Sequence, residues 1–259
     1  MFKNGGIAKM SDDKITAFVV VYNEYFRINT CLASLYGQVD EVLLFDDGSD
    51  QYAKELVSCY NHWQNVFIKA GAYFKIFYTL NHRGSHSLFY PDVVKEAKYQ
   101  WLFQLDGDEV LHPVVYQPFG FLKSMAQAAI EAKAVAVQGL RINIAQDGNQ
   151  FTTMETEPKS RLYDKTKGYF PTNRHSVEWV PQGDILQSNK LIIDHVRTKE
   201  EMDKDAAMYF KRTTKAYLES QAKNDPDNIK YYGELFMGQN NYYKWGYSSI
   251  EEAFEKGAC

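Results

Sequence analysis

Three apolar segments in the first 110 residues share one plan, which constrains the fold more than any other feature of the chain. Residues 15–22, 41–45 and 101–105 are mostly apolar, and each runs directly into a cluster of acidic, Gly, Asn or Ser residues. Short apolar runs bounded by turn residues are typical of buried strands. Because parallel strands bring their carboxyl ends to one edge of an open sheet, we expect the three polar clusters to meet there and to bind a ligand.

Amphipathic segments separate these strands. The apolar residues between positions 28 and 36 recur at helical spacing and predict a helix over 24–36. The same pattern predicts helices over 50–60 and 91–99, a strand over 73–80, a helix around 122–130 and a strand-rich stretch over 134–195. Alternating strands and helices favour an α/β fold, with a mostly parallel sheet flanked by helices.

The chain ends in a segment with only helical periodicity. From Lys199 onwards, apolar residues such as Met202, Ala206 and Tyr209 fall on one helical face. We therefore divide the sequence into a main domain over 1–198 and a C-terminal helical extension over 199–259, which is a candidate surface for homodimer formation.

Length, composition and cysteine positions narrow the classes of protein to which the chain can belong. With 259 residues and 45% hydrophobic content, the chain can bury one substantial core. The net charge of -4 and the pI near 5.9 leave nucleic-acid binding unsupported, although not excluded. No stretch approaches the roughly 20 apolar residues of a membrane span, and residues 1–10 are too polar for a signal peptide, so we expect a cytoplasmic protein. Cys31, Cys59 and Cys259 indicate neither a disulfide framework nor a zinc site.

Two carboxylates stand one residue apart after the third apolar segment. Strand alternation points Asp106 and Asp108 the same way across Gly107, which leaves space for a ligand near the backbone. Their hard oxygens suit Mg²⁺ or Mn²⁺. Taken alone, Asp-Gly-Asp is as often a plain turn as a ligand site, but the two polar clusters upstream favour the metal interpretation.

Taken together, these segments resemble glycosyltransferase family 2, the enzymes of GT-A fold that transfer a sugar from a nucleotide diphosphate to an acceptor. The resemblance spans roughly residues 15–200, and its order and spacing are more specific than any one motif. It rests on Val20-Val21-Tyr22-Asn23-Glu24, Val39-Asp40-Glu41-Val42, Asp46-Asp47-Gly48-Ser49 and Asp106-Gly107-Asp108-Glu109.

Within that family the chain is most similar to enzymes like the lipopolysaccharide-core glucosyltransferases. Their metal motif ends in Asp-Glu and is followed by an Arg-Leu-Tyr-like strand, here Asp108-Glu109 and Arg161-Leu162-Tyr163. The segment 226–253 looks like a degenerate tetratricopeptide-type hairpin, which some relatives carry in longer form. Many relatives have an Arg-Asn pair where this chain has Asn81-His82-Arg83, so Arg83 is the residue that would supply positive charge to the donor diphosphate.

The resemblance implies a donor site. The backbone around Val20 and Val21, with Tyr22, Asn23 and Glu24, would cradle the nucleobase. Asp46 or Asp47 would accept from an imide N–H of the base, most simply uracil; alone, this motif reads more readily as a helix-capping turn. Asp106 would hold the ribose or the metal, beside Gly107, and Asp108 would be the main ligand of Mn²⁺ or Mg²⁺.

The resemblance also implies an inverting displacement, in which a general base deprotonates the acceptor hydroxyl. Glu178, Glu109 and His175 are the candidates, with Glu178 first because it lies in the expected acceptor half. His195 follows the apolar run 191–193 and is a candidate third metal ligand, although a lone His at a strand end is more often only hydrogen-bonded.

These observations predict a metal-dependent glycosyltransferase that uses a nucleotide-diphosphate sugar, most simply a UDP-sugar, on a glycan, lipid or macromolecular acceptor. Two other interpretations stay open. A sugar nucleotidyltransferase shares a similar fold but begins with a Gly-rich loop, which is missing after Tyr22. A catalytically inert nucleotide-sugar binding module is disfavoured by the intact Asp106 and Asp108. The sequence does not identify the sugar, the acceptor, the general base or the oligomeric state.

Overall fold

A computed structural model describes residues 13–51, 53–80, 88–112, 119–147, 150–169, 179–198 and 200–201, with backbone alone at 147 and 150–157. The chain divides into two compact units. One comprises Met1–Ile144 and Thr152–Val196, and the other comprises Ala145–Phe151 and Arg197–Cys259. The first unit contains all three polar clusters that the sequence singled out, and it also contains His195.

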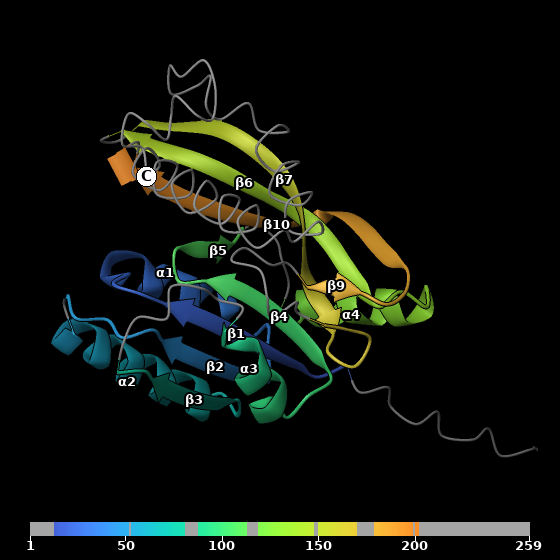
Figure 1. The fold of residues 1–259 in the computed structure, drawn as a ribbon, viewed down its shortest axis with the longest axis horizontal. Helices are drawn as coiled ribbons and strands as arrows, with labels where there is room; N and C mark the ends of the chain where they lie inside the picture. The colour runs from blue at the N-terminus through green and yellow to red at the C-terminus, as the bar shows by residue number, and fades with distance from the viewer. Residues whose placement is uncertain are drawn as a thin grey trace, which may run out of the picture. The chain divides into compact units, whose positions relative to one another are not determined.

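Four parallel strands form the first half of this unit. They are β1 (Ile15–Val21), β2 (Glu41–Asp46), β3 (Tyr73–Tyr78) and β4 (Trp101–Asp106), in the order β3-β2-β1-β4. All seven residues of β1 are buried, as expected for a strand with parallel neighbours on both sides and helices on both faces. Figure 1 shows these strands side by side.

Helices cover both faces of the parallel strands. On one face, α1 (Tyr25–Leu35), α2 (Ala53–Lys69) and α4 (Phe121–Glu131) share a core with alternate β1 residues such as Val19 and Val21. On the other face, α3 (Tyr90–Glu96) packs against Phe18 and Val20 (Figure 1). The strand period of two therefore divides the apolar residues of β1 between two cores.

The second half of the unit adds longer strands to the same sheet. These are β5 (Glu109–Leu111), β6 (Ala136–Asp147), β7 (Gln150–Asp164) and β10 (Ile185–Thr198), which extend the order to β3-β2-β1-β4-β7-β6-β10-β5. Strand β7 runs antiparallel to β4, and β5 runs antiparallel to β10. A separate pair joins β8 (Gly168–Tyr169) to β9 (Val180–Pro181).

One connection determines where the site forms. Strand β5 follows β4 after only Gly107 and Asp108, yet the two strands stand apart in the sheet order, and β5 pairs with β10 at its end. The turn between them therefore joins the parallel half to the antiparallel half. In the β5–β10 register, Glu109 lies opposite His195.

The α/β architecture with a mostly parallel first half and a strand-rich second half confirms the prediction. The helix predicted over 50–60 was wrong in length: α2 continues to Lys69, because Trp63 and Phe67 extend the apolar face begun by Leu56 and Tyr60. The predicted tail helices over 202–259 lie outside the described residues. Within the described ranges, no helix is both long enough and apolar enough to cross a bilayer.

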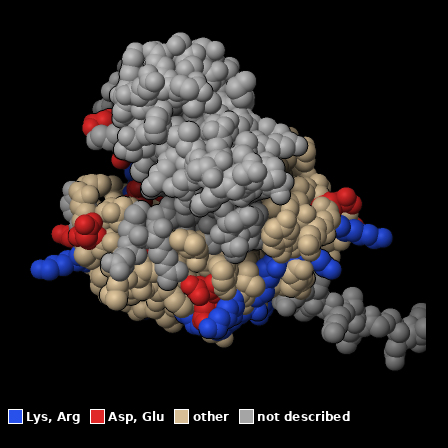
Figure 2. Space-filling view, in the orientation of Figure 1, with Lys and Arg blue, Asp and Glu red and all other residues tan. Residues whose placement is uncertain are grey.

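Charged side chains are dispersed over the surface that can be seen. In Figure 2, the described Lys and Arg side chains lie in several small groups beside described Asp and Glu side chains.

Candidate functional site

The predicted polar clusters meet at the carboxyl edge of the parallel strands. The Val20 carbonyl accepts from the Gly107 N–H at 2.9 Å, and the Val21 carbonyl accepts from the Asp47 N–H at 2.8 Å. The end of β1 thus holds the loops that follow β2 and β4. The side chains of Val20 and Val21 are buried in the two cores, so both residues support the site from beneath.

Asn23 clamps the loop after β2. Its φ of 58° places it in the left-handed region, which Asn tolerates better than most residues. Its side-chain oxygen accepts from the N–H groups of Asp50 and Gln51 at 3.1 and 3.0 Å, and its amide donates to Asp50 at 2.9 Å. Its own N–H donates to the Ser49 hydroxyl at 2.9 Å. Asn23 therefore fixes the position of the loop that follows β2.

The neighbouring residues of the first motif differ in exposure. Tyr22 is 40% exposed. Glu24 is the N-cap residue before α1; its carbonyl accepts from the Ile28 N–H at 3.0 Å and its carboxylate pairs with Arg27 at 2.8 Å. A donor that reached Glu24 would therefore meet an ion pair.

Asp46 and Asp47 are held differently. One Asp46 carboxylate oxygen accepts from the Ser49 N–H at 2.8 Å and the other accepts from the Tyr60 hydroxyl at 2.9 Å. Burial, reinforced by Asp46, raises the pKa of Tyr60, so this hydroxyl remains a donor. Asp47 is buried, and its carboxylate accepts from the Thr79 hydroxyl at 3.4 Å.

Gly107 lies where the chain approaches itself closely. A Cβ added there would be 3.2 Å from the Val21 side chain, 3.3 Å from the Val20 carbonyl oxygen and 3.4 Å from the Glu24 Cβ. The nearest atoms at this position therefore belong to β1 and the start of α1. Glycine lets the turn after β4 lie directly against the end of β1.

Glu109 is completely buried beside this turn. One of its carboxylate oxygens accepts from Arg161 at 2.5 Å and from Arg141 at 3.4 Å. The other accepts from the Asp106 N–H at 3.1 Å. The Asp106 carboxylate lies 3.6 Å from the same Arg161 guanidinium. Glu109 thus occupies a position that orients its neighbours.

Asp108 faces His195 across the turn. An Asp108 carboxylate oxygen lies 3.1 Å from His195 Nε2, and the two side chains are 7% and 16% exposed. The other ring nitrogen, Nδ1, lies 2.8 Å from the Asn143 side-chain oxygen. With its hydrogen on Nδ1, a neutral imidazole donates to the Asn143 oxygen and presents its Nε2 lone pair towards the carboxylate; with the hydrogen on Nε2, the ring donates to Asp108 instead.

Strand alternation explains how these side chains converge. Arg141 and Asn143 are two residues apart on β6, so they project from the same face. Strand β10 lies between β6 and β5 in the sheet order, and its His195 is opposite Glu109. Arg141 therefore reaches Glu109 while Asn143 reaches His195.

The structure brings together only part of the predicted metal set. Asp108 and His195 are in contact, whereas Asp106 lies beside Arg161. Among the residues that the structure describes, no group of three His, Cys, Asp or Glu side chains is arranged to hold a metal. Arg83, His175 and Glu178, which the sequence also singled out, lie outside the described residues.

A neutral thiol lies beneath the turn. Cys31 on α1 is buried, and its Sγ lies 3.6 Å from the Asp106 carbonyl oxygen. Burial raises the pKa of this thiol well above its ordinary value, with further contributions from Glu109, Asp108, Asp106 and Glu24. The Cys31 thiol therefore stays protonated in the folded protein and packs beneath the turn.

Sequence reasoning missed the cationic and amide partners. Arg141 and Asn143 were not singled out, and Arg161 was noted only as part of a resemblance. The sequence held one indication of them: Arg141 and Asn143 alternate with apolar residues in a β-rich stretch, and polar side chains buried in a sheet need hydrogen-bond partners. Their partners are distant in sequence, 52 residues away for Arg161 and Glu109.

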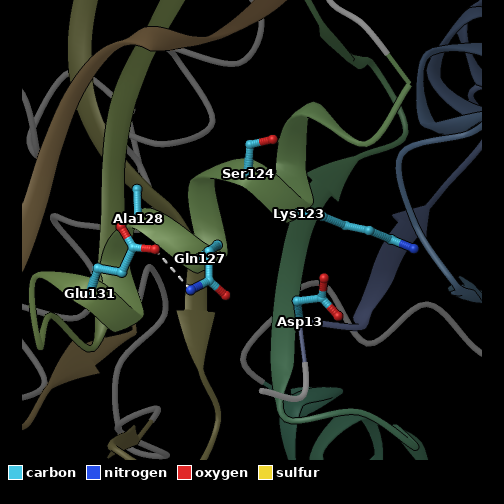
Figure 3. A pocket seen from close by; sticks show the side chains of 6 residues that line it. All are labelled: Asp13, Lys123, Ser124, Gln127, Ala128 and Glu131. Carbon is cyan, nitrogen blue, oxygen red and sulfur yellow. Dashed lines mark hydrogen bonds between the residues drawn. The ribbon is translucent and has the colours of Figure 1, made fainter. Parts of the chain in front are cut away.

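A depression lies at the opposite edge of the sheet. It is lined by Asp13, which precedes β1, and by residues of α4 (Figure 3). There Gln127 donates to Glu131 at 3.0 Å, while Lys123 points away from both. Lys123 instead pairs with Asp40 at 2.7 Å. This depression is separate from the acids at the carboxyl edge.

Comparison with the solved structure of one mannosyltransferase shows a shared fold. The mannosyltransferase PcManGT from Pyrobaculum calidifontis, in complex with GDP-Man and Mn²⁺, is 13% identical; the match covers 89% of this chain and 71% of that one, with a TM-score of 0.57. TarS from S. aureus is 17% identical, with 76% of this chain and 39% of TarS covered and a TM-score of 0.47. For TarS 1–349 in complex with UDP-GlcNAc, the identity is 15%, the coverage 72% and 59%, and the TM-score 0.46.

Sequence comparison identifies the family. No curated protein matches the chain. The model of the family described as Glycosyl transferase family 2 matches residues 16–183, a stretch that begins in β1 and includes every acid of the carboxyl edge. Because this match covers well over half of the sequence, the chain belongs to glycosyl transferase family 2.

Proposed function

We propose that this protein is an inverting, metal-dependent glycosyltransferase that moves a sugar from a nucleotide-diphosphate donor to a hydroxyl of a glycan, lipid or macromolecular acceptor. The observation that carries the proposal is the contact between Asp108 and His195 at the carboxyl edge. Family membership supports the reaction class. Within the family, the contact between Arg161 and Glu109 joins the two motifs that resemble the lipopolysaccharide-core glucosyltransferases.

The residues present suit a divalent cation. A carboxylate and a neutral imidazole are ordinary ligands of Mn²⁺, and an Nδ1–H that donates to the Asn143 oxygen would leave the Nε2 lone pair for the metal. Asp108 and His195 would hold the metal, and Asp106 is close in sequence for the ribose or the metal. Negative charge on the departing nucleotide diphosphate would be offset by the bound Mn²⁺ or Mg²⁺.

For the nucleobase, we propose Asp46 or Asp47 as the acceptor of an imide N–H, beside Tyr22. Both carboxylates are buried at the end of β2 and accept hydrogen bonds within the chain, so both stay candidates. A UDP-sugar is the proposed donor. GDP-Man, which the mannosyltransferase from P. calidifontis binds, is the natural alternative to include in a test.

For the general base, we propose Glu178. A base must reach the acceptor hydroxyl, and Glu109 is fully buried with one carboxylate oxygen against Arg141 and Arg161 and the other on the Asp106 N–H. His175 is the second candidate. Glu178→Gln is expected to abolish transfer while leaving donor binding unchanged, which calorimetric titration of the donor can verify.

The first test is a thermal-shift panel. UDP, GDP and their sugars are each added with Mn²⁺ or with a chelator, because a ligand that binds only the folded state raises the melting temperature. A rise that requires both Mn²⁺ and one nucleotide is expected, together with release of that nucleotide during incubation with the donor sugar. Binding without any turnover, in the presence of broad acceptor mixtures, would contradict catalysis and favour a binding module.

A further inference from the structure

The buried charges behind the turn form a connected group. The Glu109 side chain is 0% exposed, that of Arg161 is 7% exposed and that of Arg141 is 19% exposed. Burying ions costs several kcal/mol per group unless geometry and hydrogen bonds compensate, so a buried ion pair is weak evidence for stability by itself. The contacts of these three side chains show which parts of the chain they hold in place.

Glu109 holds both the strands and the turn. One carboxylate oxygen is directed at the guanidinium groups of β6 and β7, at 3.4 Å from Arg141 and 2.5 Å from Arg161. The other accepts from the Asp106 N–H three residues earlier, which closes the turn around Gly107. The guanidinium groups therefore fix the carboxylate, and the carboxylate fixes the backbone from which Asp106 and Asp108 project.

Arg161 touches the turn at a second point. Its Nη2 also lies 3.6 Å from the Asp106 carboxylate. The same guanidinium therefore orients the Asp106 side chain and, through Glu109, the Asp106 N–H. Arg141 has one contact in this group, at a longer distance.

We infer that Glu109, Arg161 and Arg141 form a positioning cluster that holds the Asp106–Asp108 turn in the geometry for cation binding, with Arg161 as its central residue. The inference rests on the proposed metal-dependent function. It assigns Glu109 to positioning and gives roles to two arginines whose part in the site the sequence left unassigned.

The effect of charge alone on Mn²⁺ binding is opposite in sign to the effect of positioning, so an Arg161 variant can separate the two. Asp106, Asp108 and Glu109 carry three negative charges, and Arg141 and Arg161 carry two positive charges. Removing Arg161 leaves the turn more negative, and Coulomb attraction would then strengthen Mn²⁺ binding. If Arg161 acts by positioning, its removal weakens Mn²⁺ binding despite the added negative charge.

The experiment measures Mn²⁺ affinity of the full chain by electron paramagnetic resonance titration, with a melting temperature for each variant. Arg161→Met leaves Glu109 with one fewer cation and is expected to lower stability. The double variant Glu109→Gln/Arg161→Met removes both charges and restores part of that stability. In both variants we expect Mn²⁺ to bind about 10- to 100-fold more weakly, as when a residue that orients metal ligands is removed.

Lys123→Met provides a matched control. It removes a cation from an ion pair of 2.7 Å with Asp40, at the far edge of the sheet. Its Mn²⁺ affinity is expected to equal that of the wild type. A double variant that melts like the wild type and binds Mn²⁺ equally well or more tightly would overturn the positioning role.

The two proposals fail in different ways. If the wild type binds no Mn²⁺, with or without a nucleotide diphosphate, the metal-dependent function fails and the positioning role falls with it. If the wild type binds Mn²⁺ and the Arg161 variants bind it unchanged, only the positioning role fails.

Discussion

Acidic side chains lie at both edges of the parallel sheet, but their partners differ. At the amino edge, Asp40 accepts from the Ile15 N–H at 3.1 Å and from Lys123 at 2.7 Å. Glu41, which is fully buried, accepts from the Thr16 hydroxyl at 2.7 Å and from the Lys98 N–H at 2.8 Å. At the carboxyl edge, Asp108 faces His195 Nε2, while the other ring nitrogen, Nδ1, contacts the Asn143 side-chain oxygen.

The difference shows which acids are structural. The amino-edge carboxylates accept from donors that the chain provides, Asp40 on both oxygens and Glu41 on one; the second Glu41 oxygen is buried without a hydrogen-bond partner among the described residues. At the carboxyl edge, Glu109 likewise accepts from donors within the chain, whereas the Asp108–His195 contact is completed by a proton or a cation. Acidity alone therefore does not mark a site, and the nature of the opposing atom does.

Asp108→Ala gives the largest expected effect on this comparison. We expect metal-dependent donor binding to disappear and transfer to fall by about three orders of magnitude, because several kcal/mol of charge stabilisation are lost. The circular dichroism spectrum should match the wild type. Unchanged Mn²⁺-dependent donor affinity would remove Asp108 from the proposed metal site.

Asn143→Leu should have the next largest effect. Without the amide oxygen, the His195 ring loses the partner that fixes its tautomer and orientation. Mn²⁺ affinity is expected to fall by about 10- to 100-fold. Isothermal titration with Mn²⁺ measures this, and recovery in Asn143→Asp, which restores an acceptor, would separate orientation from a packing defect.

Glu41→Ala tests the amino edge. The change leaves the Thr16 hydroxyl and the Lys98 N–H without their shared acceptor, at a cost of about 1–3 kcal/mol per buried group. Denaturant unfolding should show this loss. Mn²⁺ affinity, measured well below the unfolding midpoint, should stay at the wild-type value, and a large drop would mean that the two edges are coupled.

The smallest expected effect concerns Cys31 under the carboxyl edge. Its pKa is raised in the folded state, so folding stability is full below the ordinary thiol value of 9.0 and falls as the pH rises above it. The measurement is the free energy of unfolding between about pH 8 and pH 10. Cys31→Ala should show a shallower alkaline decline than the wild type, and an identical decline would assign the effect to other groups.

Much of the fold can be predicted from local patterns in the sequence. The apolar runs of β1, β2 and β4 and the helical spacing of α1 are short-range features, and each appears where it was expected. The convergence of the three polar clusters was predicted because parallel strands bring their carboxyl ends to one edge of the sheet. The end of α2 was missed because the prediction stopped at Tyr60 although Trp63 and Phe67 continue its apolar face.

The partners within the site could not be predicted in the same way. Whether His195 contacts Asp106, Asp108 or Glu109 depends on the β5–β10 register, which only the folded sheet defines. The arginines are also assigned by strand order, since β6 and β7 enter the sheet between β4 and β10. Residues that meet across about 50 positions or more leave no periodic pattern in a single sequence.

The family match and the site do not coincide completely. The matched stretch ends at residue 183, before β10 begins at Ile185. All the acids of the turn are inside the match, whereas His195 is outside it. The proposed metal site therefore combines a turn from the matched region with a ligand from a strand that lies beyond it.

The short β5 strand has a consequence for how the protein folds. Asp108 and His195 are 87 residues apart, and they meet only after β10 has paired with β5. Contacts between residues so far apart in sequence form more slowly than local ones, so we expect this pairing late in folding. A nascent chain that has emerged only as far as β9 already carries every acid of the turn but lacks the imidazole, so capture of the ion would report that the last strand of the sheet has arrived.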